Sequence, residues 1–173
     1  MDNKDIEKAN TGESKPSWMD GLRIGNQVIS SGSPVKVLGI RSDFGTELPF
    51  VLCDDTDVWY QGSVEPIPIS VPILRGNGFG MSDDLSYGIL RTTFTPFGDG
   101  TTQEFEDYVI IDLAIPQNCL VKHQYLVEHD GYKPSLHCRT YEGEIRYVHE
   151  LQNLMDELGC SRRIKVTEEM MKQ

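Results

Sequence analysis

The residues with the most suggestive chemistry lie near the C-terminus, in the stretch His149-Glu150-Leu151-Gln152-Asn153. It differs by one residue from H-E-x-x-H, in which two histidines one helical turn apart bind zinc and the glutamate activates water. Here Asn153 replaces the second histidine, and a carboxamide is a poor zinc ligand. We therefore interpret the stretch as part of an amphipathic helix with His149 on its solvated side, and we do not expect a metallopeptidase.

A second group of metal-binding residue types comprises Cys119, His123, His137 and Cys138. Cys119 and His123 are four residues apart and would share one face of a strand, whereas the adjacent His137 and Cys138 would point to opposite faces. The spacing matches no standard zinc pattern, so buried thiols with surface histidines are the expectation. We predict no tightly bound transition metal and no other cofactor, although the sequence leaves open whether these four side chains converge.

Other patterns carry less chemistry. The acidic run Asp54–Asp57 is typical of a solvated hairpin turn, although its carboxylates could hold a cation. Asp112 is a candidate buried carboxylate without a visible partner. The glycines of Arg75–Gly80 lack the lysine of a phosphate loop, and G-x-S-x-G is absent. The sequence therefore favours a protein that is not an enzyme, with no catalytic, cofactor-binding or metal-binding residue.

Composition restricts the partners. The chain has 173 residues, a net charge of −11 and only 16 Lys and Arg. A nucleic-acid-binding protein usually presents a basic face, so nucleic acid is an unlikely partner. The one basic cluster, Arg162–Lys165, is interpreted as charge that complements a helix C-terminus.

No apolar run approaches the ~20 residues of a membrane helix, and the first residues form no signal peptide. We therefore expect a cytoplasmic protein without membrane contact, with four free thiols in or near the core.

The first half of the chain predicts a polar tail and a small β subdomain. Residues 1–17 are polar and lack periodicity, which is typical of a disordered tail. Residues 18–80 contain short strand candidates separated by turns, a pattern that favours a small curled antiparallel sheet or barrel. Pro66, Pro68 and Pro72 exclude a central strand, so this part is read as an extended crossing segment with a helical turn around residues 73–75.

The second half, residues 81–173, predicts a sheet and a helix, either as a separate domain or continuous with the first. Strand candidates at 87–94, 107–115, 119–129 and 135–142 have short links, which indicates an antiparallel meander. A helical period of apolar residues follows, ending at a glycine suited to a left-handed cap: Ile145, Val148, Leu151, Met155, Leu158 and then Gly159. The expected fold class is α+β, mainly antiparallel β, with this one amphipathic helix packed on the sheet.

Several segments occur in an order that resembles a known group of proteins. They are "LRIGNQV" (22–28), "VKVLGI" (35–40), "VEPIPIS" (64–70), "GFG" (78–80) and "YVHELQNLMDEL" (147–158). The chain resembles a group of short, uncharacterised proteins of phages, prophages and mobile elements of gut bacteria. The resemblance implies a mobile-element origin and a shared fold, and no catalytic activity. It also implies a helix before the "GF" turn, where this chain instead carries Pro72, Gly76 and Gly78.

Together these observations lead to one functional hypothesis and two alternatives. We expect a non-catalytic accessory protein of phage or mobile-element origin that acts through contacts with an unknown protein partner. The first alternative is a nucleic-acid-associated module built on a small N-terminal barrel, and the second is a metal-dependent hydrolase. The sequence does not indicate the oligomeric state.

Overall fold

A computed structural model describes residues 17–42, 49–55, 59–61, 64–94, 105–114, 117–129, 132–160 and 162–172. The predicted tail, residues 1–17, lies outside this range except for its last residue. The described chain forms two antiparallel sheets with short helices, which confirms the α+β class. Among the described residues, no helix is long and apolar enough to cross a bilayer.

The N-terminal sheet has the strand order β1-β2-β3-β4 and is open. Its strands are β1 (Gln27–Ser30), β2 (Ser33–Arg41), β3 (Phe50–Cys53) and β4 (Trp59–Gln61). Of the two forms expected, a small curled sheet or a barrel, the sheet is present and the barrel was wrong. The short helix η1 (Ser17–Gly21) precedes the sheet, and Met19 and Leu22 are buried in the same apolar cluster as Val28 and Val51. These side chains contribute to the core of an open sheet, which reduces the need for strand closure.

The proline-rich segment crosses between the sheets as predicted. Among its described residues it pairs through isolated bridges, Ile29 with Glu65 and Pro68 with Tyr147. It then forms α1 (Val71–Gly76), with Pro72 in the first turn, where the missing N–H costs nothing. The helical turn expected around residues 73–75 is thereby confirmed, and the segment has the helix that the resemblance implies at this point.

The C-terminal sheet has the order β5-β6-β7-β8-β9. Its strands are β5 (Gly80–Met81), β6 (Tyr87–Phe94), β7 (Phe105–Asp112), β8 (Asn118–His129) and β9 (Tyr132–Glu144). The predicted meander is confirmed, with the last strand longer than expected. In the β7–β8 register Asp107 lies opposite His123, so both side chains fall on the face of the sheet that α2 covers.

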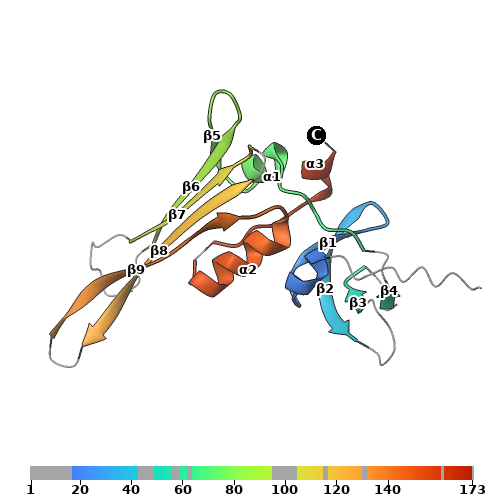
Figure 1. The fold of residues 1–173 in the computed structure, drawn as a ribbon, viewed down its shortest axis with the longest axis horizontal. Helices are drawn as coiled ribbons and strands as arrows, with labels where there is room; N and C mark the ends of the chain where they lie inside the picture. Colours follow the sequence, from blue (N-terminus) through green and yellow to red (C-terminus); the bar gives the residue numbers. More distant parts are fainter. Residues whose placement is uncertain are drawn as a thin grey trace, which may run out of the picture.

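Helix α2 (Val148–Leu158) lies between the two sheets, and α3 (Glu168–Met171) ends the described chain (Figure 1). The apolar stripe of α2, including Leu151 and Met155, is buried in one cluster with Val109 and Val121 of the C-terminal sheet. Gly159 ends the helix at φ 83°, the left-handed cap that the sequence predicts.

The buried apolar residues form two clusters. One consists of residues of the N-terminal sheet and the segments beside it. The other is formed by the C-terminal sheet, α1, α2 and the chain after α2. Ile67, Leu74 and Phe79 belong to the second cluster although they precede residue 81. The proposed division at residue 80 stays a prediction. All four cysteines are free thiols; Cys53, Cys119, Cys160 are buried, whereas Cys138 is exposed.

Candidate functional site

Part of the polar face of α2 is buried. His149 is 0% exposed and Asn153 8%, so the expected position of His149 was wrong. Its Nε2 lies 3.1 Å from the carbonyl oxygen of Trp18, an arrangement that requires Nε2 to carry the proton. Among the described residues Nδ1 has no hydrogen-bond partner. Burial lowers the pKa of His149, so the imidazole is held neutral.

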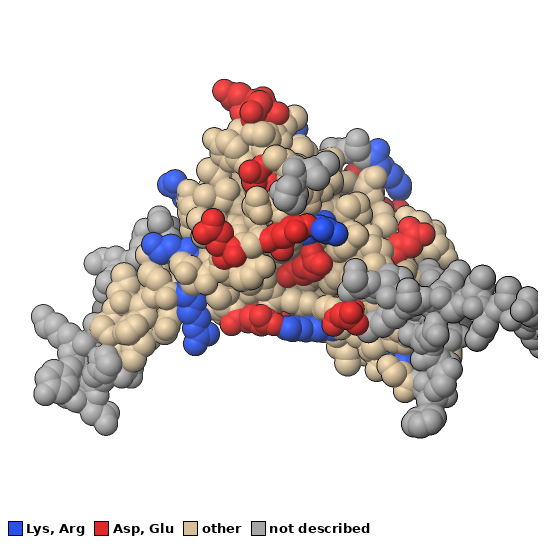
Figure 2. Space-filling model, in the orientation of Figure 1, with Lys and Arg blue, Asp and Glu red and all other residues tan. Residues whose placement is uncertain are grey.

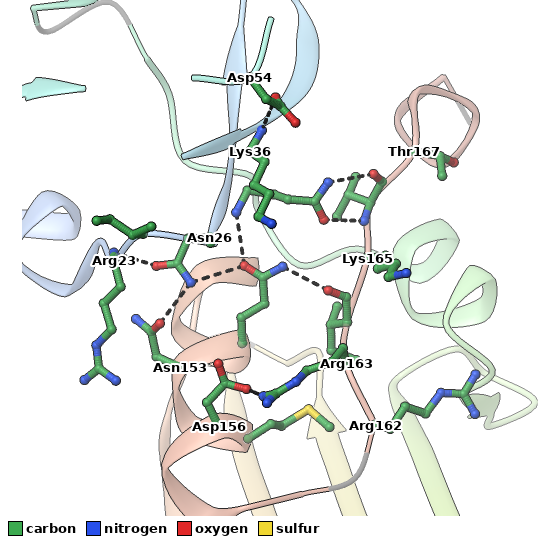
Figure 3. Close-up of a pocket in the computed structure, with 17 residues that line it drawn as sticks. Arg23, Asn26, Lys36, Asp54, Asn153, Asp156, Arg162, Arg163, Lys165 and Thr167 are labelled. Carbon is green, nitrogen blue, oxygen red and sulfur yellow. Dashed lines mark hydrogen bonds and ion pairs between the residues drawn. The ribbon is translucent and has the colours of Figure 1, made fainter. Parts of the chain in front are cut away.

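His149 and Asn153 are buried because the N-terminal sheet packs on this face of α2 through a polar network (Figure 3). Asn26 donates to Asn153 Oδ1 at 2.9 Å, and Asn153 donates to the Gly21 carbonyl at 2.5 Å. Gln152 accepts from the Gln27 backbone N–H at 3.1 Å. Buried amides are tolerated only when hydrogen-bonded, and here each amide is satisfied from another element.

The network continues to the C-terminal segment 162–167. Gln152 donates to the carbonyl of Ile164 at 2.9 Å. The Gln27 side chain forms a strand-like pair with Val166, donating to its carbonyl at 2.9 Å and accepting from its N–H at 2.7 Å. The segments "LRIGN" and "HELQN" that carry the sequence resemblance thus meet in one hydrogen-bonded junction. The polar residues of "HELQN" hold parts of the fold together and are not arranged as zinc ligands.

A cavity of about 540 Å³ opens beside this junction. Its charged lining consists of five basic and two acidic residues: Arg23, Lys36, Arg162, Arg163, Lys165, Asp54 and Asp156. Arg23 pairs with Glu157, and Arg163 pairs with Asp156. The basic cluster therefore follows the end of α2, as expected from the sequence, and Arg163 pairs with Asp156 near the helix C-terminus. The described lining residues carry a net positive charge, which favours binding of an anionic group.

The four predicted metal-ligand candidates do not converge. Cys119 and His123 lie on the covered face of β8, whereas His137 and Cys138 are exposed on β9. His123 is 9% exposed, so the expectation of surface histidines holds only for His137. His123 instead meets Asp107, with 2.5 Å between Nδ1 and Oδ1. The Cys160 thiol completes a buried group whose donor atoms all lie within 4.8 Å of one another.

Sequence reasoning missed Asp107 and Cys160 because they lie 16 residues before and 37 residues after His123 in the printed sequence. The available signal was Asp107 at the same alternating positions as the apolar Val109 and Ile111.

The other carboxylates that the sequence suggested as candidates have ordinary local hydrogen bonds. Asp112 is partly exposed and accepts from the Ala114 N–H at 2.8 Å, and Asp54 accepts from the Lys36 N–H at 2.7 Å. Asp57 lies outside the described residues.

The tip of the C-terminal sheet is a two-stranded arm. β7 pairs with β8 only as far as His123, so residues 124–129 pair with residues 132–138 alone among the described strands. We call these residues the arm; Figure 1 shows that it extends away from α2. A lone two-stranded ribbon is marginally stable in water. Such a protruding ribbon is more plausible as a contact element than as part of the core.

An aromatic and cationic cluster lies at the base of the arm. Tyr125 stacks on His123, with ring centroids 6.0 Å apart and planes at 7°, and its centroid is 5.7 Å from that of His137. The guanidinium of Arg139 lies 5.0 Å from the centre of the Tyr125 ring. Tyr141 is 37% exposed, and on the opposite face of β9 Leu136 is 50% exposed. Tyr and Arg are the residue types that most often dominate binding energy in protein interfaces.

No family model matches the chain, and no curated protein or solved structure matches it. Functional inference therefore depends on the geometry of this chain.

Proposed function

We propose that the protein is a non-catalytic accessory protein, of phage or mobile-element origin, that binds a partner protein through β9 and the arm. The observation that carries the proposal is the exposed edge strand β9, 13 residues long, with Arg139, Tyr141 and Leu136 exposed. An exposed strand edge presents backbone N–H and C=O groups that an added strand can pair with. The mobile-element origin rests on the sequence resemblance alone.

The occupant we propose is an extended segment of the partner with acidic side chains. Backbone pairing along β9 would supply affinity, and the guanidinium of Arg139 beside exposed His137 would select carboxylates. The chain as a whole carries a net charge of −11, so most surfaces outside the basic cavity would repel such a segment. Figure 2 shows acidic and basic side chains scattered over the visible face, without a continuous basic surface.

The two alternative functions have less support. The nucleic-acid module was based on an N-terminal barrel, and the sheet is open. The metal-dependent hydrolase was based on the stretch around His149, whose ring is buried and bonded to a backbone carbonyl. Neither alternative is proposed further.

The test is differential capture from host or infected cells. The wild-type chain, the double variant Leu136→Lys/Arg139→Glu and the control Leu38→Lys would each be immobilised, and bound proteins quantified by mass spectrometry. Leu38 is 47% exposed on the other sheet, which makes Leu38→Lys a matched control for an added surface charge. We expect one protein that is enriched equally by the wild type and the control, and at least tenfold less by the double variant.

Two outcomes contradict the proposal. One is a set of captured proteins that does not differ between the wild type and the arm variant, when both variants melt like the wild type. The other is a wild-type chain that is dimeric by light scattering and becomes monomeric in the arm variant, because the occupant would then be a second copy. A partner whose contact region lacks acidic residues would contradict the charge argument only.

A further inference from the structure

A buried group of three metal-binding side chains lies between the C-terminal sheet and the end of α2. Asp107 comes from β7, His123 from β8 and Cys160 from the residue after the helix cap. Their exposed fractions are 2%, 9% and 4%, and their donor atoms all lie within 4.8 Å of one another. We propose that Asp107, His123 and Cys160 bind a divalent transition metal, with Zn²⁺ as the best match. The proposal is independent of the partner-binding function.

The donor set fits zinc. Zn²⁺ accepts imidazole nitrogen, thiolate sulfur and carboxylate oxygen together in a tetrahedral site, with bonds of about 2.0–2.3 Å. Bonds of that length place neighbouring donor atoms roughly 3.3–3.7 Å apart. The Asp107–His123 contact of 2.5 Å would have to open by about 1 Å. Side-chain rotation can supply such a change. A harder cation such as Mg²⁺ would not favour a thiol.

The surroundings favour a cation. The carboxylate of Asp107 is buried, and a buried charge is costly unless it is paired or coordinated. The C-terminal end of α2, where the helix dipole is negative, lies beside the cluster: a Cβ placed on Gly159 would be 3.6 Å from His123 Nε2. The Asp107 carboxylate and the negative end of the helix dipole therefore lie beside His123 and Cys160, where they would stabilise a bound metal ion.

A Cys-His-Asp nucleophilic triad would use the same residue types, but the environment of Cys160 opposes it. Burial, followed by the nearby Asp107, raises the pKa of the thiol to about 12. A nucleophilic cysteine needs a lowered pKa and usually lies at a helix N-terminus, whereas Cys160 follows a C-terminus. Zn²⁺ binds the thiolate, so metal binding at this site would release the thiol proton.

This inference replaces the sequence-based expectation that no metal binds. That expectation was based on Asn153 in place of a second histidine and on the spacing of the cysteines, and it did not group Cys160 with Asp107 and His123. The three ligands proposed here join two strands to the chain after α2. Metal binding would thus tie the helix end to the sheet, and a ligand that binds only the folded state raises the melting temperature.

The experiment is an anaerobic titration of reduced, tag-free, metal-depleted protein with Co²⁺ and then Zn²⁺. We expect one Co²⁺ per chain with a thiolate-to-cobalt charge-transfer band, displacement of Co²⁺ by Zn²⁺, and a higher melting temperature with Zn²⁺. Cys160→Ser should abolish the band and weaken binding at least tenfold. Cys138→Ser is the matched control, since that thiol is exposed, and it should behave like the wild type.

The wild-type titration alone can overturn the proposal, even if Cys160→Ser fails to fold. A wild-type chain that binds neither ion overturns it and leaves a hydrogen-bonded Asp–His pair beside a buried thiol. A charge-transfer band that is lost in Cys138→Ser and kept in Cys160→Ser assigns binding to the wrong thiol and also overturns it. None of these results affects the capture experiment, because Leu136 and Arg139 are not ligands.

Discussion

The junction between "LRIGN" and "HELQN" makes a quantitative prediction through the Asn26–Asn153 pair. Replacing Asn153 by alanine removes two hydrogen bonds, one from Asn26 at 2.9 Å and one to the Gly21 carbonyl at 2.5 Å. A typical net hydrogen bond contributes about 1 kcal/mol, and each buried group left unpaired costs about 1–3 kcal/mol. Asn26 can still donate to Gln152 at 3.4 Å. The expected loss is therefore about 2–4 kcal/mol.

A double-mutant cycle isolates the pair. Asn26→Ala also loses the bond that Asn26 Oδ1 accepts from the Arg23 N–H at 2.7 Å, so it should cost about 2–4 kcal/mol as well. Because the two asparagines share one hydrogen bond, the double variant should be more stable than additivity predicts, by about 1–2 kcal/mol. Urea denaturation of the four proteins, with unchanged m-values, gives these free energies.

The control for this cycle is Glu157→Ala on the same helix. Its carboxylate pairs with Arg23 at the surface, where an ion pair contributes about 0–1 kcal/mol. If each asparagine variant costs less than ~0.5 kcal/mol and their effects add within ~0.3 kcal/mol, the asparagines do not meet in a buried junction. The packing of the N-terminal sheet on α2 would then be wrong.

Three other changes test the same helix. Leu151→Ala should cost ~2–5 kcal/mol in urea denaturation, because Leu151 is 1% exposed in the core, and a loss below ~1 kcal/mol would place it at the surface. Gly159→Ala should cost ~1–2 kcal/mol, because φ is 83°; an unchanged midpoint would contradict the left-handed cap. Burial lowers the pKa of His149 below its usual 6.5, so only the unfolded chain gains this proton as the pH falls. The contribution of this group to the free energy of unfolding is complete above about pH 6.5 and declines below it. His149→Gln should therefore reduce the fall of the urea midpoint between pH 7 and pH 5. An unchanged pH dependence would refute the assignment.

The sequence predicts those parts of the fold whose signal is local. The C-terminal strands alternate or form apolar runs, prolines exclude a central strand at 66–72, and Gly159 marks the end of α2. Strand closure in the N-terminal half was not predictable in the same way. It depends on how many strands the core requires, and here Met19 and Leu22 contribute to that core from outside the sheet.

The position of His149 could not be predicted because an apolar period identifies only the hydrophobic face of a helix. The opposite face can be buried as well if its polar groups find partners, and those partners come from residues 18–27, more than 120 positions earlier. A near-match to a zinc motif on such a face has a simple physical explanation. Amides and an imidazole at helical spacing are suitable for catalysis, and they are equally suitable for satisfying a polar junction.

The buried cluster of Asp107, His123 and Cys160 could not be predicted for a different reason, because it depends on how separate strands pair. Asp107 faces His123 only because β7 and β8 pair in one register. A slip of one residue would turn Asp107 to the other face and place Val109 and Ile111 in solvent, so the apolar residues of β7 fix the position of its one buried acid. Cys160 reaches the same point because Gly159 reverses the chain at the end of α2. The apolar residues of β7 thus determine where Asp107 lies, but their pattern does not indicate that His123 and Cys160 lie beside it. The three side chains can be recognised as a candidate metal site only when the sheet register and the helix cap are both known.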